Sequence, residues 1–161
     1  MTQQKTIHKL RLSFNYPDKP TKTVLIEYAK EAHNDITPAE KTKIRKRFRE
    51  SLLRKKNASC RISGVRNPKL LIASHIKPLA LCTTNHEAVS SDNGLLLIRD
   101  YDYLFDKGFI SFNNDGSALF SDKFSAEDYV DLGLHLGTNI GELNDEQIYY
   151  MGFHRRFVFK G

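Results

Sequence analysis

Apolar side chains recur at a spacing of four from Ile44 through Phe48 to Leu52. This spacing places them on one face of a helix. Thr37-Pro38-Ala39-Glu40 comes just before, with an N-cap threonine, a proline at the first helical position and a glutamate spaced to complete a capping box. The pattern therefore predicts a helix that begins at this tetrapeptide and runs to about Lys56.

Two short apolar runs follow, and they are typical of strands rather than helices. Leu70 to Ile76 and Leu95 to Ile98 are predicted as strands, separated by a polar loop. A short helix is expected next, from near Asp100, which would cap it, to Gly108, which can adopt the left-handed conformation that ends helices. The central part of the chain therefore has the order strand, loop, strand, helix.

A β-hairpin is predicted after this central part. Phe109 to Phe112 and Ala118 to Phe120 flank a turn that contains Asp115-Gly116, and Asp-Gly favours hairpin turns because it tolerates positive φ. Ser125 and Asn144 each have the character of an N-cap residue for a later helix. The predicted fold class is α+β, with helices at both ends and a hairpin after the central strands.

The first 36 residues differ from the rest. Leu10 to Tyr16 and Thr23 to Tyr28 are rich in β-formers and are separated by Pro17-Asp18-Lys19-Pro20, which indicates a hairpin or an extended arm. We therefore divide the chain into a β-rich arm over residues 1–36 and a single domain over residues 37–161. A chain of 161 residues is large enough to form one core.

The composition indicates in which cellular compartment the protein is located. The apolar fraction is 40%, yet no apolar run is long enough to cross a bilayer, so we expect no membrane partner. The N-terminus lacks the apolar core of a secretory signal, which predicts a cytoplasmic protein. Cys60 and Cys82 are too few and too far apart for a zinc knuckle or a disulfide framework, and we expect two buried free thiols.

The net charge of +6 is unevenly distributed. Residues 122–146 hold seven acids and one lysine, whereas the predicted first helix and the residues just after it are strongly basic. This asymmetry predicts a polyanion bound on one side of the molecule, although a basic run can also be no more than a solvated face. The basic residues of that stretch are Lys41, Lys43, Arg45, Lys46, Arg47, Arg49, Arg54, Lys55 and Lys56.

Four polar residues lie at the ends of the central elements, where side chains converge easily: His75, Asn93, Asp102 and Asp106. Asp102 and Asp106 are four residues apart, so on a helix they share a face and could hold one hard divalent cation through oxygen atoms. His75 could deprotonate a water molecule for attack on a phosphodiester, because imidazole titrates near neutral pH. Taken singly, each residue is more simply a structural side chain.

Three motifs together resemble the HNH endonucleases, specifically the bacterial branch of restriction-type nucleases. They are Ser74-His75-Ile76-Lys77-Pro78, Asn93-Gly94-Leu95-Leu96-Leu97 and Asp102-Tyr103-Leu104-Phe105-Asp106-Lys107-Gly108. The stretches Phe48-Arg49-Glu50-Ser51-Leu52-Leu53 with Cys60-Arg61-Ile62-Ser63-Gly64, and Phe153-His154-Arg155-Arg156-Phe157-Val158-Phe159, extend the likeness. Only about the first 35 residues are then unmatched.

The resemblance implies a ββα-metal core over about residues 69–108. It assigns His75 as the general base and Asn93 as the residue that orients the active-site loop or His75. Asp102 and Asp106 take the metal-binding positions, and Asp102 stands where many relatives carry histidine, which favours Mg²⁺ or Mn²⁺. Many relatives also have a ligand where this chain has Ser74, so the number of ligands stays open. A structural zinc is not expected.

The expected partner is DNA. Phosphate contacts are predicted for six basic residues, which would position the duplex without reading its sequence: Arg45, Arg47, Arg49, Lys77, Arg155 and Arg156. His154 beside the last two more often packs or caps in such a terminal helix. Because one HNH centre cuts one strand, double-strand cleavage would need two nicks, another chain or a homodimer.

Several functions stay open on the sequence. The leading hypothesis is a metal-dependent endonuclease that hydrolyses DNA, acting in restriction or phage defence. Within the same enzyme class, a nonspecific or RNA-directed nuclease, including a toxin, is the alternative. From a different class, the chain could be a DNA-binding module that has lost catalysis, although such a decayed site would have no chemical reason to keep all four polar residues.

Overall fold

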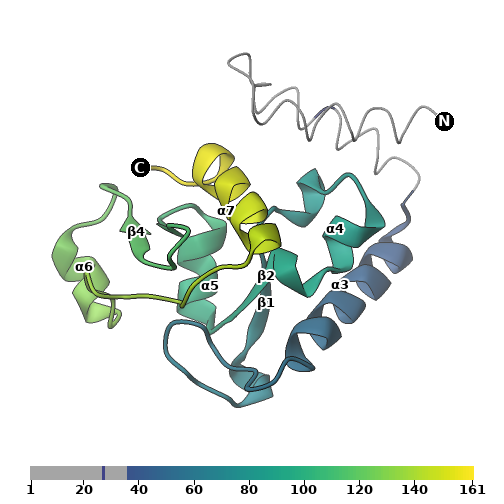
Figure 1. The fold of residues 1–161 in the computed structure, drawn as a ribbon, viewed down its shortest axis with the longest axis horizontal. Helices are drawn as coiled ribbons and strands as arrows, with labels where there is room; N and C mark the ends of the chain where they lie inside the picture. Colours follow the sequence, from purple (N-terminus) through teal and green to yellow (C-terminus); the bar gives the residue numbers. More distant parts are fainter. Residues whose placement is uncertain (1–26, 28–35) are drawn as a thin grey trace.

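The computed structural model describes Glu27 and residues 36–161 (Figure 1). The β-rich arm predicted over residues 1–36, with its strands at Leu10 to Tyr16 and Thr23 to Tyr28, therefore lies almost wholly outside the described residues. At Glu27, the only described position before residue 36, the backbone is helical rather than extended.

The predicted first helix is confirmed as α3 (Pro38–Leu53). Thr37 is its N-cap, and the Thr37 and Glu40 side chains form the expected capping box by each accepting the other's backbone N–H. Phe48 and Leu52 are buried on the apolar face. The helix ends at Leu53, slightly before the predicted Lys56, and Arg54 caps it in a helical conformation.

The central strands pair in antiparallel fashion as β1 (Ile72–His75) and β2 (Gly94–Leu97), with His75 opposite Gly94. The predicted first strand was too long, because Pro68–Leu70 forms a 3-10 turn before it. The connection between the strands is compact and largely helical: it contains short 3-10 turns at Leu79–Leu81 and Ser91–Asn93 and the helix α4 (Asn85–Val89).

The helix α5 (Arg99–Asp106) follows β2 directly. Its N-cap is Ile98, whose side chain makes no capping hydrogen bond, so the prediction that Asp100 caps this helix is wrong; Asp100 lies in the first turn. Gly108 ends the helix at φ +76°, as predicted. A side chain there would also collide with the Val158 carbonyl, so two constraints require glycine at this position.

The predicted hairpin is confirmed as β3 (Ile110–Phe112) and β4 (Ala118–Phe120), with Gly116 at φ +81° in the turn. The helices α6 (Ala126–Asp131) and α7 (Asp145–Phe157) follow, and each begins with a capping box, at Ser125 and Asn144 respectively. The described residues thus form a mixed α/β structure with two small antiparallel sheets, and the order β1, β2, α5 is consistent with an HNH core.

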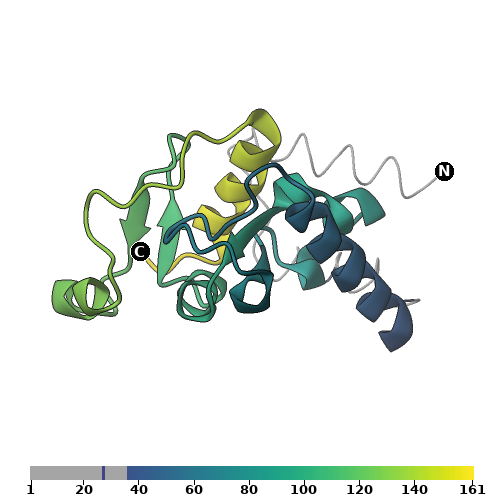
Figure 2. The same ribbon diagram turned by 90° about the horizontal axis from the view of Figure 1, so that it is seen from below.

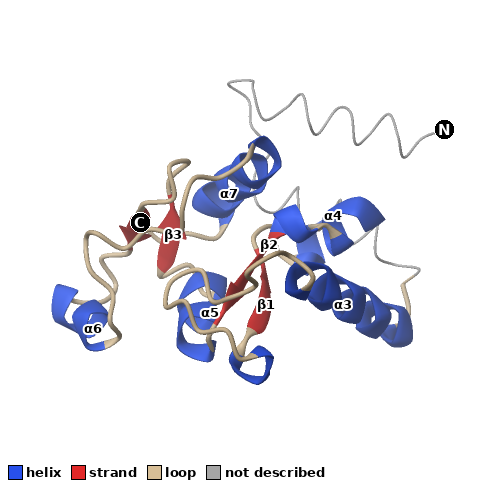
Figure 3. Cartoon of the chain, turned by 60° about the horizontal axis from the view of Figure 1, so that its bottom comes forward, coloured by secondary structure: helices blue, strands red, loops and turns tan. Residues whose placement is uncertain are grey.

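The two strands β1 and β2 lie between α3 on one side and α5 on the other (Figure 3). Helix α7 packs against the hairpin, while α6 lies at the end of the molecule farthest from α3 (Figure 2). One apolar cluster joins these elements, with Phe48, Leu97, Phe105 and Met151 all nearly inaccessible to solvent.

Both cysteines are buried thiols that form no disulfide within the described residues, as predicted. Burial raises the pKa of the Cys82 thiol to about 12, so it stays protonated at neutral pH. Each helix in the described part of the chain is too short or too polar to cross a bilayer.

Candidate active site

His75, at the end of β1, is held from two directions. Its imidazole stacks on the Phe48 ring of α3, with ring centroids 3.6 Å apart and planes inclined by 13°. Its Nε2 lies 3.0 Å from the backbone oxygen of Ala88 in α4. The ring is thus half-buried between the first helix and the connection that follows its own strand.

These contacts determine which ring nitrogen can act as a base. The Ala88 carbonyl can only accept a hydrogen bond, so the Nε2 that faces it carries the hydrogen and Nδ1 keeps a lone pair. Nδ1 has no hydrogen-bond partner among the described residues. Every fully buried polar side-chain atom among those residues has a partner, and Nδ1 is therefore accessible to solvent.

The electrostatic surroundings keep this imidazole neutral. Burial lowers the pKa of His75 below its ordinary value of 6.5, and the positive charge of Arg45 on α3 lowers it further. The hydrogen bond to Ala88 opposes this shift without reversing it. At neutral pH the imidazole therefore has the unprotonated nitrogen that a general base needs.

Asn93 is a buried residue whose side chain hydrogen-bonds the backbone of the connection between β1 and β2. Its side chain is fully buried, and Oδ1 accepts the Lys77 N–H at 2.7 Å. Its Nδ2 donates to the carbonyls of Glu87, at 2.9 Å, and Lys77, at 3.2 Å. Asn93 thus bridges the beginning and the end of the connection, which is the place from which a side chain can orient the loop around His75.

The two carboxylates predicted to bind metal differ in their surroundings. Asp102 is half-buried on α5, and Ser74 Oγ donates to its Oδ1 over 2.5 Å. Asp106 is exposed and pairs with Lys107 at 2.9 Å. Ser74 contacts α5 whereas His75 contacts α3, as expected for successive side chains on opposite faces of a strand.

A group of three or more histidine, cysteine, aspartate or glutamate residues placed to hold a metal ion is absent from residues 36–161. The oxygen donors of Asp102 and Asp106 nevertheless fit Mg²⁺ chemically. That ion binds in proteins through one or two carboxylates and completes its shell with water and phosphate oxygens. Asp102 and Asp106 are thus the residues that could hold a divalent ion here.

The predicted phosphate contacts on α3 include exposed side chains and one side chain that hydrogen-bonds the backbone. Arg45 and Arg47 are exposed, and neither forms an ion pair within the described part of the chain. Arg49 instead donates to the carbonyls of Leu71, at 2.5 Å, and Pro68, at 2.6 Å. Its guanidinium therefore anchors the turn before β1 to the helix.

The other predicted phosphate contacts divide in the same way. Lys77 is only 5% exposed and binds both carboxylate oxygens of Glu87, so it is not presented to solvent. Arg155 donates to the Phe112 carbonyl and to Asn114 Oδ1, while Arg156 is exposed beside the Phe157 ring.

His154 illustrates a histidine that packs. It is buried on α7, stacks on Phe105 with centroids 3.9 Å apart, and hydrogen-bonds through both nitrogens, to Ser111 Oγ and to the Phe105 carbonyl. Burial lowers its pKa to about 4. Unlike His75, it has no free nitrogen for chemistry, and the expectation that it packs is confirmed.

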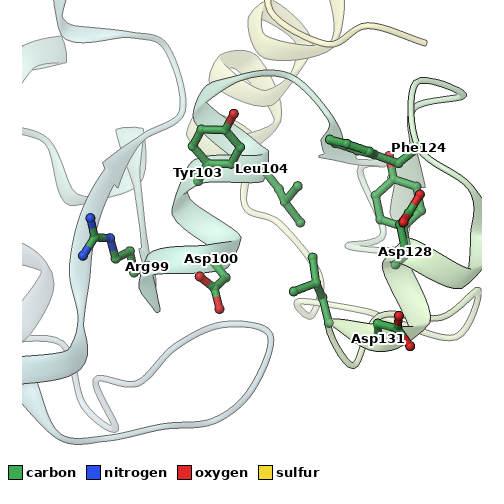
Figure 4. Close-up of a pocket in the computed structure, with 9 residues that line it drawn as sticks. Arg99, Asp100, Tyr103, Leu104, Phe124, Asp128 and Asp131 are labelled. Carbon is green, nitrogen blue, oxygen red and sulfur yellow. The ribbon is translucent and has the colours of Figure 1, made fainter.

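A cavity of about 480 Å³ lies between α5 and α6, and Tyr103 and Phe124 are among the residues that line it (Figure 4). Its wall is mainly apolar, and three carboxylates stand around it: Asp100, Asp128 and Asp131. Arg99 is the one basic residue in the lining, so the negative charge predominates, and we do not assign the cavity to the nucleic-acid site.

Sequence reasoning missed Glu87. It lies in α4, within the stretch predicted as a polar loop, ten residues after Lys77, and no periodicity or motif indicates that these two residues meet. Phe48 was predicted only as an apolar helix residue, because its contact with His75 depends on how α3 docks on the strands.

Comparison with known proteins adds one positive finding. Residues 60–113 match the family model of the HNH endonucleases, and no curated protein matches the chain. The matched segment contains β1, β2 and α5, together with His75, Asn93, Asp102 and Asp106. This segment, about a third of the chain, is thus similar to the HNH endonucleases.

Proposed function

We propose that the chain is a metal-dependent endonuclease that hydrolyses DNA phosphodiester bonds. The observation that carries the proposal is the state of His75. Inside the segment that matches the HNH family, this histidine has Nε2 on a backbone carbonyl and a solvent-accessible Nδ1, in surroundings that lower its pKa. These are the properties of a general base that acts at neutral pH.

In the proposed reaction, His75 Nδ1 accepts a proton from a water molecule, whose oxygen attacks the phosphorus atom. Asp102 and Asp106 would hold the divalent ion, Mg²⁺ or Mn²⁺. When bound, such an ion stabilises the negative charge that grows on the phosphate and on the departing 3′ oxygen. Asn93 keeps the connection between the strands in place throughout.

Arg45 and Arg47 are the proposed phosphate contacts on α3. Both are exposed, and the charge of Arg45 lowers the pKa of His75, which supports a phosphate contact near the proposed base. Arg156 is a further exposed candidate on α7. Contacts of this kind hold the DNA backbone irrespective of sequence. Biologically, we propose a role in restriction or phage defence in the cytoplasm.

The test is incubation of the protein with supercoiled plasmid in the presence of Mg²⁺, Mn²⁺ or a chelator. We expect nicked or linear DNA with either metal and intact plasmid with the chelator. Asp102→Asn should weaken the metal-dependent cleavage, whereas the exposed Asp122→Asn should cleave as the wild type does. Plasmid that stays intact under all metal conditions would overturn the proposal.

Two further assays separate the alternatives. Duplex DNA and RNA offered together should show preferential loss of the DNA, while preferential loss of RNA would identify an RNA-directed nuclease. Sequencing the ends of the DNA products distinguishes a restriction enzyme, which cuts at a defined site, from a general nuclease with random ends.

A further inference from the structure

The Lys77–Glu87 ion pair is buried in the connection that follows His75. We propose that this pair is a positioning device for His75: it holds the connection between β1 and β2 so that the Ala88 carbonyl stays on Nε2 and Nδ1 stays free to accept a proton. The proposal rests on the proposed function, in which His75 is the general base.

The pair is buried and closely bonded. Lys77 Nζ lies 3.0 Å from Glu87 Oε1 and 2.8 Å from Oε2, and the two residues are 5% and 7% exposed. The Glu87 carboxylate also accepts the Thr83 backbone N–H at 2.8 Å. On its other side, Lys77 Nζ lies 5.2 Å from the centre of the Phe153 ring.

Both residues of this ion pair are close to His75 along the chain. Lys77 comes two residues after His75, and Glu87 immediately precedes Ala88, whose carbonyl bonds the imidazole. The Glu87 carbonyl is further tied to Asn93, which also bonds the backbone of Lys77. A change in the distance between Lys77 and Glu87 therefore moves the acceptor that fixes the histidine.

Stability alone is a poor reason for such a pair. Two buried charges lose their hydration, and replacing a buried ion pair with apolar side chains of similar size is often neutral or stabilising. Buried ionic groups can instead specify one arrangement of the chain, because an apolar pair tolerates small shifts that directed hydrogen bonds do not. Here the arrangement specified is that of the connection carrying Ala88.

The test compares Glu87→Gln and the double variant Lys77→Met/Glu87→Met with the wild type. The double variant leaves no unpaired buried charge and is expected to keep its fold, while Glu87→Gln keeps the volume and part of the hydrogen bonding. Thermal unfolding identifies the folded variants. Asp122→Ala/Lys123→Ala, which removes an exposed ion pair, serves as the matched control.

Two readouts are required. Nitrogen-15 NMR of the full chain reports the His75 tautomer without reference to activity: we expect the Nε2–H form in the wild type and a measurable Nδ1–H population in both variants. In steady-state cleavage, kcat should fall by about tenfold while KM changes little. The reason is that a general base contributes less to catalysis when it is correctly placed for only part of the time.

A folded double variant with the wild-type tautomer would overturn the positioning role, whatever its activity. The tautomer readout also separates this inference from the proposed function. A wild type that cuts no nucleic acid, with variants that still lose the Nε2–H preference, would support the positioning role of the Lys77–Glu87 pair and contradict the proposed nuclease activity. The control variant should match the wild type in both readouts.

Discussion

At the scale of single residues, the sequence predicts candidate reactive groups but not the contacts that hold them. His75, Asn93, Asp102 and Asp106 follow from motifs whose residue types suit phosphodiester hydrolysis. The contacts of the imidazole with Phe48 and Ala88 join segments that are distant in the sequence. Such contacts depend on tertiary packing, which no local pattern encodes.

The lowered pKa of His75 predicts the pH dependence of cleavage. Burial and Arg45 both favour the neutral imidazole, so the base stays active to lower pH than a histidine of ordinary pKa 6.5 would. A plot of log kcat/KM against pH should turn downward on the acid side at a pH below 6.5. An acid-side inflection above 6.5, measured at saturating Mg²⁺, would contradict this account of the site.

His154 predicts how stability depends on pH. Its pKa is about 4 in the folded protein, against 6.5 ordinarily, so the unfolded chain binds a proton first as the pH falls. Stability present above pH 6.5 should therefore be lost between about pH 6.5 and pH 4. Linkage predicts a loss of roughly 2 kcal/mol from this residue between pH 7 and pH 5.

Urea unfolding of the wild type and of His154→Gln at these two pH values measures the His154 contribution. We expect the variant to be less stable at pH 7 but to lose less stability on acidification. Equal losses in the two proteins would show that His154 does not titrate as described.

At the scale of elements, prediction succeeded where capping and turn chemistry are local. The capping box of α3, the N-caps of α6 and α7, the Gly108 stop and the Gly116 turn each lie within a few residues. It failed at the start of α5, where Ile98 takes the cap position although Asp100 is the better capping side chain. There β2 leads directly into the helix, and the tertiary geometry overrides the local preference.

The packing of α3 on β2 makes Gly94 critical. A Cβ at this position would collide with the Phe48 ring, and the Leu52 methyl carbon would lie only 2.8 Å away. Gly94→Ala should therefore destabilise the protein by about 1–3 kcal/mol through overpacking, and it should displace the ring on which His75 stacks.

Gly152→Ala is the matched control, because within the described part of the chain its Cβ meets only Arg155 Nη2, at an ordinary 3.8 Å inside helix α7. It should stabilise the protein by roughly 0.5–1 kcal/mol. Urea midpoints and cleavage rates of the two variants give the comparison. A Gly94→Ala protein as stable and active as Gly152→Ala would show that α3 does not pack as described.

At the scale of the whole molecule, charge is separated along the long axis. Basic α3 and acidic α6 lie at opposite ends, so the field favours nucleic acid on the α3 side (Figure 1). The sequence predicted this polarity from charge counts. It could not predict which arginines stay free, because Arg49 and Arg155 are engaged by carbonyls of distant segments.

Salt dependence tests the α3 surface. If Arg45 and Arg47 each contact one phosphate, Arg45→Ala/Arg47→Ala should weaken duplex binding and reduce the slope of log K against log salt by about 2. Fluorescence anisotropy in a chelator, from low to moderate salt, measures this slope. Lys123→Ala, at the acidic end, should leave it unchanged; an equal slope for the double variant would remove α3 from the interface.

The most direct test of the central claim compares two single histidine substitutions in one plasmid assay. His75→Ala removes the proposed base, whereas His86→Ala removes an exposed histidine on the neighbouring α4, whose side chain pairs with Glu146. With Mg²⁺ or Mn²⁺, the wild type and His86→Ala should convert supercoiled plasmid at similar rates. Cleavage by His75→Ala should be slower by about 100-fold or more. Cleavage by folded His75→Ala at the wild-type rate would contradict the account.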